Sequence, residues 1–564
     1  SRVVQMSSAM DFIGNLNMYN LHYPKPWSAY PDYPHTAYWI DKPFLFPWYG
    51  PGRAHMPSWT WRKDKPLYFG EFTCVYGATP DNQASIIGDT AFEQADCGNA
   101  LIHEKLWPLE INAYRRKDVS GFCAWACMFH EAKDVGKRLA EPAVAAHSYA
   151  LRPLALIRHT ERQHYLGGDE AEMELSIHND TRNQLPLELT CELLDGKQAI
   201  WSERMPAAMY GPGENLAFTS RLRLPDCANA KTLAYRATLC SGRKTVDAWT
   251  RELYLAPKDA GIKLPASCVF FDPDGAVAAR LKARGISGGS FPRTMAELER
   301  IAPISMLWLH FPLAKIHLGE WEQLRKIAFG LASGGATVVM DKPMAAALRN
   351  LPVEVKLGKG YAHGAESALE ITYAYNHAPH HPLLREMGDG EFCLWGADYY
   401  VAHQTFEVPQ EGNSLPLLVA GIGNVVTSPL LEMPLGKGSI LLSSLEILEK
   451  LAEHPVPLKM LSRLADYSPG HSEKTAGIAV SVDTLRICRE VGLETTAASS
   501  AVQALQADVA LIDGECLDDA AIGQLSAALQ AGKTVCLHDL GVEKSGQVLA
   551  QLGLPGEASD GKTK

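Results

Sequence analysis

The sequence has no apolar run of the length that crosses a bilayer, since none of its hydrophobic stretches reaches about 18–20 residues. It also has no cluster of Lys and Arg that resembles a phosphate-binding patch, and its formal net charge is −11. These two absences predict a protein that does not span a membrane. They also argue against binding to nucleic acid or to an anionic membrane surface.

The 12 cysteines have none of the paired spacing that marks a metal site. We expect free thiols, although Cys191 and Cys240 remain candidates for a bridge that their spacing does not require. No cysteine lies in the Gly-x-Cys-x-Gly setting that an amidotransferase nucleophile needs. Lys437 follows a glycine but lacks the second, upstream glycine of a phosphate-binding loop. The sequence therefore predicts neither a metal nor a cofactor.

What the chain does have is length, because 564 residues with 46% hydrophobic content can bury several cores. Changes in pattern divide it into four predicted domains. These are residues 1–150, 151–260, 261–470 and 471–564, and whether the last domain is complete stays open. No signal peptide is visible, so a secreted or periplasmic location and a cytoplasmic one both stay open.

The most informative stretch is Lys65–Thr73, an apolar strand that ends on a carboxylate, Glu71, between Gly70 and Phe72. A predicted helix over Asp96–Lys117 follows, and then a Trp-bearing strand over Gly121–Phe129. Two further strand-like runs, Arg2–Ser7 and Asn17–Tyr23, come before. Parallel α/β barrels keep their catalytic groups at the carboxyl ends of such strands.

Together these segments resemble strands five to eight of a family 2 glycoside hydrolase, in the clan of retaining barrel enzymes. The resemblance implies that Glu71 is the nucleophile, that Tyr23 hydrogen-bonds it, and that Trp125 floors the sugar subsite. A retaining glycosidase uses one carboxylate as nucleophile and a second as acid and base, about 5–5.5 Å apart. Each residue also has a purely structural interpretation. Glu71 would form an ion pair at the strand end, Tyr23 would pack at the barrel rim, and Trp125 would pack in the core.

A long segment between the second and third of these strands, residues 24–61, is rich in aromatic rings, proline and glycine. Loops of this length are uncommon unless they are functional, and aromatic faces bind the C–H faces of sugars. Some of the rings must instead form the segment's own small core. The substrate-binding candidates here and on the adjoining strand end are His22, Trp39, Arg53, His55, Trp59 and Trp61.

One departure from the family pattern matters more than the matches. The resemblance places the acid/base glutamate on strand four, which would precede Ser1, and a full barrel takes about 250 residues. Four strands do not close a barrel, and their open edges would invite aggregation. We therefore expect the missing half, strands one to four, to come from the same precursor or from another chain.

Beyond residue 150 the pattern becomes alternating and strand-like. Met173, Leu175 and Ile177 share one strand face, and Leu187 to Leu193 repeats the alternation. Later runs cover Leu216–Leu224 and Leu233–Leu255, with turn signals at Asn179-Asp180, Asp195-Gly196 and Gly211-Pro212-Gly213. Several short alternating strands over about a hundred residues predict a β-sandwich of immunoglobulin type.

From about residue 265 the chain alternates strands and helices. The predicted strands are Ser267–Phe271, Met306–Phe311, Thr337–Asp341 and Ser439–Leu445, with a β-rich insertion over about 354–437. The predicted helices are one through Arg284, Leu318–Ser333 and Pro455–Tyr467. This resembles the flavodoxin-like, class I glutamine-amidotransferase-like fold that many bacterial glycosidases carry as an accessory or trimerisation domain. Strands Ala476–Val480, Asp508–Asp513 and Thr534–His538 predict a second such unit.

The fold class expected is thus α/β and β multidomain: the C-terminal half of a (β/α)8 TIM barrel, an immunoglobulin-like sandwich, and flavodoxin-like α/β domains. The function implied by the resemblance is a retaining exo-β-glycosidase of β-galactosidase type that forms a homo-oligomer. Endo-acting polysaccharide hydrolysis, β-mannosidase and β-glucuronidase activity stay open. So does a different class, a non-catalytic carbohydrate-binding or assembly protein.

Overall fold

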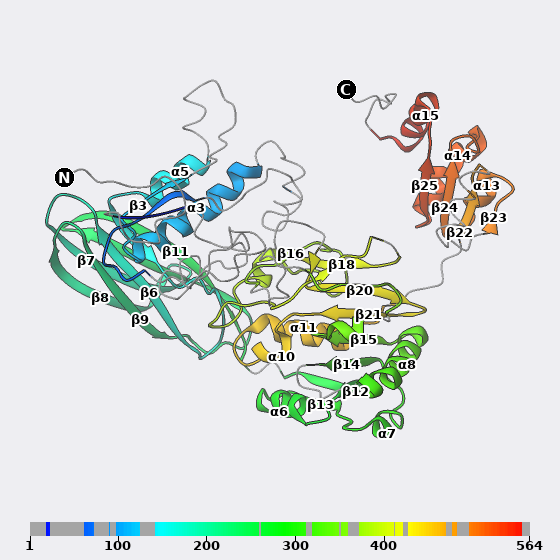
Figure 1. Cartoon of the computed structure of the whole chain (residues 1–564), viewed down its shortest axis with the longest axis horizontal. Coiled ribbons are helices and arrows are strands. Elements are labelled where there is room, and N and C mark those ends of the chain that lie inside the picture. Colours follow the sequence, from blue (N-terminus) through cyan, green and yellow to red (C-terminus); the bar gives the residue numbers. More distant parts are fainter. Residues whose placement is uncertain are drawn as a thin grey trace. The chain divides into compact units, whose positions relative to one another are not determined.

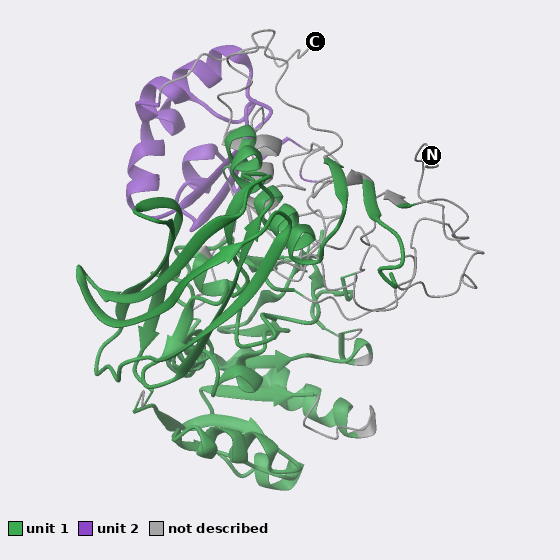
Figure 2. Cartoon of the chain, turned by 90° about the vertical axis from the view of Figure 1, so that its left-hand side faces the viewer, with its two compact units in different colours: residues 1–470 green, residues 471–564 purple. Residues whose placement is uncertain are grey.

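A computed structural model describes residues 18–22, 61–72, 90, 98–124, 142–258, 261–311, 318–348, 351–358, 371–410, 412–420, 427–469, 476–481, 485 and 496–554. The chain divides into two compact units, residues 1–470 and 471–564, coloured separately in Figure 2.

The N-terminal part of the first unit contains a parallel sheet covered by a helix. Its strands are β1 (Tyr19–His22), β2 (Leu67–Phe72) and β3 (Gly121–Ala124), in the order β1-β2-β3. Helix α3 (Gly98–Arg116) connects β2 to β3, and α5 (Pro142–Ala150) follows. The predicted order of strand, helix and strand is confirmed, whereas the predicted strand Arg2–Ser7 and most of residues 24–61 lie outside the described residues.

Two sheets then face each other across one core, and all their strand pairs are antiparallel except β5 with β11, which is parallel. The first has the order β4-β6-β9, and the second has the order β5-β11-β10-β7-β8. The strands are β4 (Leu154–Arg158), β5 (His164–Leu166), β6 (Glu170–Asn179), β7 (Leu185–Asp195), β8 (Gln198–Tyr210), β9 (Glu214–Arg223), β10 (Lys231–Ser241) and β11 (Lys244–Ala256).

Period-two alternation explains how this sandwich closes. Leu187, Leu189, Cys191 and Leu193 of β7 are all buried, and they share a core with Leu175 of β6 in the opposite sheet. Successive strand residues point to opposite faces, so every second side chain enters this core. The predicted turns at Gly196 and Gly213 are confirmed, because both glycines adopt positive φ values between strands. Gly242, which was not predicted as a turn, does the same.

The α/β domain of the first unit has one mixed sheet with helices on both faces (Figure 1). Its parallel strands lie in the order β13-β12-β14-β15-β21. They are β12 (Lys263–Phe271), β13 (Ser287–Ser290), β14 (Met306–His310), β15 (Thr337–Asp341) and β21 (Gly438–Ser443). The helices are α6 (Ala276–Ala283), α7 (Met295–Leu298), α8 (Leu318–Gly334), α9 (Ala345–Leu348), α10 (Ile447–Lys450) and α11 (Pro455–Asp466).

Both faces of these strands are buried, as their continuous apolar sequences predict. Trp308 of β14 belongs to the core that includes α6, α10 and α11, whereas its neighbours Leu307 and Leu309 belong to the core that includes α8. A strand between two helical layers needs no polar face. This arrangement explains why the four main strands were recognisable in the sequence.

The predicted β-rich insertion extends the same sheet. Strands β16 (Tyr375–Asn376), β18 (Leu415–Val419) and β20 (Leu430–Leu435) continue it from β21 by antiparallel pairing. Short strands β17 (Phe406–Glu407) and β19 (Thr427–Ser428) form a separate pair. The insertion is therefore joined to the sheet through its backbone.

The second unit is a smaller parallel sheet with the order β23-β22-β24-β25. Its strands are β22 (Ala476–Ala479), β23 (Thr496–Ala497), β24 (Val509–Asp513) and β25 (Thr534–His538), and its helices include α13 (Ala501–Ala504), α14 (Asp519–Gln530) and α15 (Val542–Leu552). Helix α14 begins where Asp518 accepts a hydrogen bond from the Ala521 N–H at 2.8 Å. The three strands predicted here are confirmed.

The chain is thus a mixed α/β protein rich in β-sheet. Among the described residues, no helix combines the length and the apolar character needed to cross a membrane. The closure of β1, β2 and β3 into part of a barrel, and the immunoglobulin type of the sandwich, remain predictions.

Candidate functional site

At the carboxyl ends of three parallel strands, the predicted nucleophile position lies opposite one other predicted site residue, His22. Strand β2 is central, with β1 on one side and β3 on the other. The backbone register places His22 opposite Glu71, and Phe72 opposite Ala124. In a parallel sheet all carboxyl ends lie at one edge, so the last residues of β1, β2 and β3 share that edge.

A register slip occurs just before Glu71. Leu21 is opposite Phe69, but the next residue of β1, His22, is opposite Glu71, so β2 holds one extra residue at Gly70. The pairing with β3 slips over the same stretch, since Phe69 is opposite Phe122 and Phe72 is opposite Ala124. Such bulges re-aim side chains, often beside active sites, and glycine in a strand often marks them.

The other predicted residues differ in what the structure says of them. The side chains of Glu71 and His22 lie outside the described residues, although both backbones are placed. Tyr23 follows the end of β1 and Trp125 follows the end of β3, and both are outside the described residues. The same holds for Trp39, Arg53, His55 and Trp59. Their roles as catalytic or substrate-binding residues stay predictions.

Trp61 is the predicted aromatic residue of the 24–61 segment that the structure describes in full. It is 8% exposed, and its indole N–H donates to the carbonyl of Lys65 at 2.9 Å. Lys63 places its amine 5.5 Å from the indole ring. In this position Trp61 stabilises the turn that leads into β2, and its assignment to substrate binding stays a prediction.

Helix α3 packs on one face of the parallel sheet through Tyr114. The ring of Phe69 from β2 meets Tyr114 edge-on at 4.7 Å, and the ring of Phe122 from β3 lies 5.8 Å from it. Phe122 therefore faces the helix, and successive side chains of a strand alternate between its two faces. By that alternation Cys123, between Phe122 and Ala124, faces away from α3.

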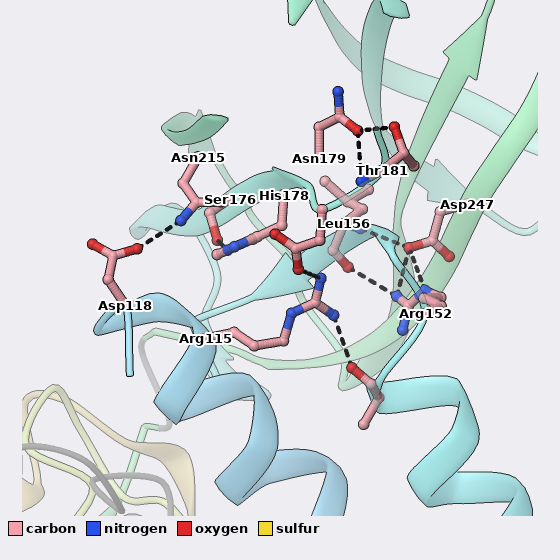
Figure 3. Close-up of polar contacts among 12 residues, drawn as sticks. Arg115, Asp118, Arg152, Leu156, Ser176, His178, Asn179, Thr181, Asn215 and Asp247 are labelled. Carbon is pink, nitrogen blue, oxygen red and sulfur yellow. Dashed lines mark hydrogen bonds and ion pairs between the residues drawn. The ribbon is translucent and has the colours of Figure 1, made fainter. Parts of the chain in front are cut away.

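Polar contacts fasten α3 to the sandwich (Figure 3). Arg115 forms an ion pair with Asp180 at 2.8 Å and donates to the carbonyl of Ala150 at 2.8 Å. Just past the helix, Asp118 accepts from the side-chain amide of Asn215 at 2.7 Å. One helix end is thereby tied both to α5 and to two sandwich segments.

The residues after α5 are tied down as well. Asp247 of β11 accepts from the guanidinium of Arg152 and, at 2.7 Å, from the backbone N–H of Leu156. Asp247 is buried, and its charge is matched by the arginine, as a buried carboxylate requires. The sandwich therefore fixes the position of the helical layer behind β1, β2 and β3.

A cavity of about 200 Å³ lies between α3, α5 and the sandwich. Its lining is Pro108, Leu109, Asn112, Arg116, Tyr149, Arg152, Leu156, Arg158, His159, Glu161 and Trp249. The α3 residues belong to the half of that helix that leads into β3, toward the amino ends of the parallel strands. That end of a barrel serves stability rather than catalysis.

The charges in the cavity wall are matched within the protein. Arg158 makes two hydrogen bonds to Glu161, at 3.1 and 2.8 Å, and Arg152 pairs with Asp247. Burial, together with the nearby Arg116, lowers the pKa of His159 to about 3, so its ring is neutral. These pairings give the cavity wall a structural role.

A second group of charges lies at the carboxyl edge of the α/β sheet, and the sequence reasoning missed it. His310 ends β14 and Asp341 ends β15, and the two are hydrogen-bonded at 2.5 Å. The other ring nitrogen of His310 is 3.3 Å from Glu449 of α10. Lys342 lies 2.7 Å from Glu449 and 3.0 Å from Glu446.

These charges hold one another in place. Burial opposes a charged ring, but the hydrogen bond to Asp341 and the ion pair with Glu449 outweigh it and raise the pKa of His310 to about 9. Burial would raise the pKa of Glu449, but the contacts with His310 and Lys342 outweigh burial and lower that pKa to about 2. His310 and Glu449 are thus both charged at neutral pH and lie beside each other. We call His310, Asp341, Lys342, Glu446 and Glu449 the α/β edge cluster.

Cys268 of the α/β domain lacks the features of a catalytic nucleophile. Cys268 lies within β12 and donates to the carbonyl of Ala465 at 3.6 Å. Burial raises the pKa of the Cys268 thiol, the opposite of what an activated thiolate needs. The described cysteines are free, including Cys191 and Cys240. Within the described part of the chain, no His, Cys, Asp and Glu side chains gather in a way that would hold a metal.

Comparisons with known proteins give little. No known family and no curated protein matches the sequence. An exo-chitosanase from Amycolatopsis orientalis is 14% identical over 30% of this chain, with a TM-score of 0.23, and the match spans 21% of that enzyme. A β-glucosidase from Listeria innocua is 13% identical over 18% of this chain and 16% of its own, with a TM-score of 0.14. A CARDB domain from Pyrococcus furiosus matches with a TM-score of 0.15. These likenesses are too slight to carry an argument about fold or function.

Proposed function

We propose that this chain carries the nucleophile strand of a retaining β-glycosidase and that Glu71 is the nucleophile. The observation that supports it is the parallel order of β1, β2 and β3, with the register slip that sets Glu71 opposite His22. A carboxylate at the carboxyl end of a central parallel strand is where barrel enzymes keep such a group.

The slip also bears on which face Glu71 takes. Without the extra residue at Gly70, Glu71 would share the face on which Phe69 packs against Tyr114 of α3. One extra residue reverses the alternation. We therefore propose that Glu71 faces away from α3, on the side that would be the interior of a barrel, together with its register partner His22.

The proposed reaction has two steps. The carboxylate of Glu71 attacks the anomeric carbon and forms a covalent glycosyl-enzyme while the aglycone leaves with a proton from a second carboxylic acid. Water then attacks that carbon, with the second carboxylate as base, and releases the sugar with its original configuration. In this scheme Tyr23 stabilises the ionised nucleophile by a hydrogen bond, and Trp125 stacks on the sugar face.

The finer parts of the proposal follow the family resemblance. They are exo-action on a terminal β-galactoside, half of a (β/α)8 barrel completed by other polypeptide that holds the acid/base glutamate, an immunoglobulin-like sandwich, and amidotransferase-like accessory units in a homo-oligomer. β-Mannosides, β-glucuronides and internal polysaccharide linkages are the substrates to compare.

The test uses Glu71→Ala in the full chain, assembled with the polypeptide that supplies strands one to four, and dinitrophenyl β-glycosides, whose leaving group departs without a proton. We expect turnover to fall by a factor on the order of 10⁴–10⁶. Azide should restore part of it, because a small anion fits the space left by the carboxylate and attacks from the same side. The rescued product should be the α-glycosyl azide, the inverted anomer.

Glu104→Ala is the matched control, since Glu104 is an exposed glutamate on α3. It should turn over as the unsubstituted chain does. Undiminished turnover by Glu71→Ala would contradict the assignment. Sugar binding without turnover in either protein would favour the carbohydrate-binding alternative.

A further inference from the structure

The sandwich meets the α/β domain at a junction built around two histidines. Strand β5 of the sandwich contacts α11 of the α/β domain, and Arg162 beside it donates to the carbonyl of Glu453. At the centre the rings of His164 and His454 lie 5.1 Å apart. His164 also stacks on Tyr254.

Both histidines are buried, and the hydrogen bonding of His454 requires a neutral ring. His454 is 0% exposed, and its Nδ1 accepts the N–H of Val456 at 3.3 Å, which caps the start of α11. A nitrogen that accepts carries no proton. Its other nitrogen, Nε2, has no hydrogen-bond partner among the described residues. Protonation at Nδ1 would therefore remove the cap of α11.

The charges that face the two rings are mainly positive. Arg162, Arg251 and Lys459 act on His164, while Arg162 and Lys450 act on His454. The carboxylates at the junction are already paired with these cations: Glu161 with Arg251, Glu391 with Lys459, and Asp398 and Glu453 with Lys450. A proton on either ring would thus add a buried cation among cations, which costs free energy.

We propose that the His164–His454 contact makes the junction between the sandwich and the α/β domain acid-sensitive, closed at neutral pH and opened in mildly acidic surroundings. The proposal does not depend on glycosidase activity. In this proposal the chain responds to the pH of its surroundings through two histidine rings, one from each domain.

The direction follows from linkage. Burial and the nearby cations lower the pKa of His164 to about 4, and burial lowers that of His454 well below its ordinary value. The closed junction then binds fewer protons than the open one below about pH 6.5. Closure is fully favoured above that pH and weakens as the pH falls toward 4. For His164 alone, the opening equilibrium at pH 5 should be about 30-fold larger than at pH 7.5.

Hydrogen exchange on the full chain tests this locally. The reporters are the Tyr254 N–H, which bonds to the carbonyl of Gln163, and the Val456 N–H, which bonds to His454. After correction for intrinsic rates, their protection should drop at least about 30-fold between pH 7.5 and 5. Protection in β7 and β10, in the centre of the sandwich, should stay constant.

The measurement must be local, because the contact between α3 and the sandwich also contains neutral histidines. His178 bonds to the hydroxyl of Ser176 near the attachment of α3 in Figure 3, and His159 bonds to the same hydroxyl. The pKa of His178 is lowered to about 4, mainly by burial. Global melting in acid would report protonation at both contacts together. Hydrogen exchange at the reporter amides reports the His164–His454 junction alone.

The double variant His164→Phe, His454→Asn removes both titrating groups. Phenylalanine keeps a ring against Tyr254, and asparagine is a good helix cap. Its reporter amides should lose less than about 3-fold of their protection over the same pH range. The control His403→Asn changes a 41%-exposed ring and should behave as the unsubstituted chain does. Unchanged protection in the unsubstituted chain at pH 5, or full acid sensitivity in the double variant, would overturn the proposal.

Discussion

The carboxyl ends of parallel strands meet at two edges in the first unit, and the two edges are built differently. In the α/β sheet the register is regular there, and His310 is directly opposite Asp341. Their charges, with those of Glu449 and Lys342, form a closed group of ion pairs. In the β1-β2-β3 sheet the register slips by one residue immediately before the strand-end carboxylate, Glu71.

The difference shows that a strand-end carboxylate is not by itself an active site. Asp341 is 0% exposed, and its carboxylate is hydrogen-bonded to His310 within the protein. Lys342, the next residue, takes a left-handed φ of 53°, a conformation that costs a non-glycine residue about 1–2 kcal/mol. Its pairing with Glu446 and Glu449 offsets that cost. A catalytic edge needs a carboxylate that the fold leaves for a substrate, which is what we propose for Glu71.

The largest effect is expected from breaking the α/β edge cluster. Asp341→Asn keeps the shape but removes one of the two negative charges beside His310, so a buried cation loses the closer of its two carboxylate partners. Unfolding free energy should fall by about 3–5 kcal/mol in denaturant titrations. Glu322→Gln, at a half-exposed pair with Arg325, is the control and should cost less than about 1 kcal/mol. A small effect of Asp341→Asn would mean that the two edges do not differ as described.

The pH dependence of stability sharpens the same comparison. Because the pKa of His310 is raised to about 9 in the folded chain, the folded state holds an extra proton between about pH 6.5 and 9. The stabilisation is fully present below pH 6.5 and is lost as the pH rises through 9, by up to about 3 kcal/mol. His310→Gln should flatten the profile over that interval. An equally steep profile in the variant would assign the slope to other groups.

The smallest effect is expected at a similar pair in the second unit. His538 and Asp513 end β25 and β24 and are bonded at 3.1 Å, but the His538 side chain is 61% exposed. Exposed pairs contribute little, so His538→Ala should change unfolding free energy by less than about 1 kcal/mol. A loss as large as that of Asp341→Asn would show that exposure is not what separates the two pairs.

Local patterns in the sequence predicted the regular parts of the fold. The alternation in β7 and the glycine turn after it placed that hairpin, and the continuous apolar runs placed β14 and β15. Strand β13 was missed, because Ser287–Ser290 is made of serine and glycine, which have low strand propensity. Its pairing with β12 comes from the backbone alone.

What the sequence could not give is pairing over long distances. The α/β edge cluster joins His310 to Glu449, and nothing local to either residue predicts their meeting. The slip at Gly70 is a property of β2 against its neighbours, so it appears only when the strands are paired. The strand, the helix and the carboxylate of the candidate site were predictable, whereas the register that sets its face was not.

The central claim, that Glu71 is the nucleophile, is tested most directly by trapping the glycosyl-enzyme. A dinitrophenyl 2-deoxy-2-fluoro-β-glycoside has a leaving group that needs no acid, and its fluorine slows the second step. The full chain, assembled with the polypeptide that supplies strands one to four, is incubated with the galactoside, mannoside and glucuronide forms. Peptide mass spectrometry then locates the label. The account predicts one sugar on the peptide that contains Glu71 and no labelling of Glu71→Gln. A label on any other carboxylate would contradict it.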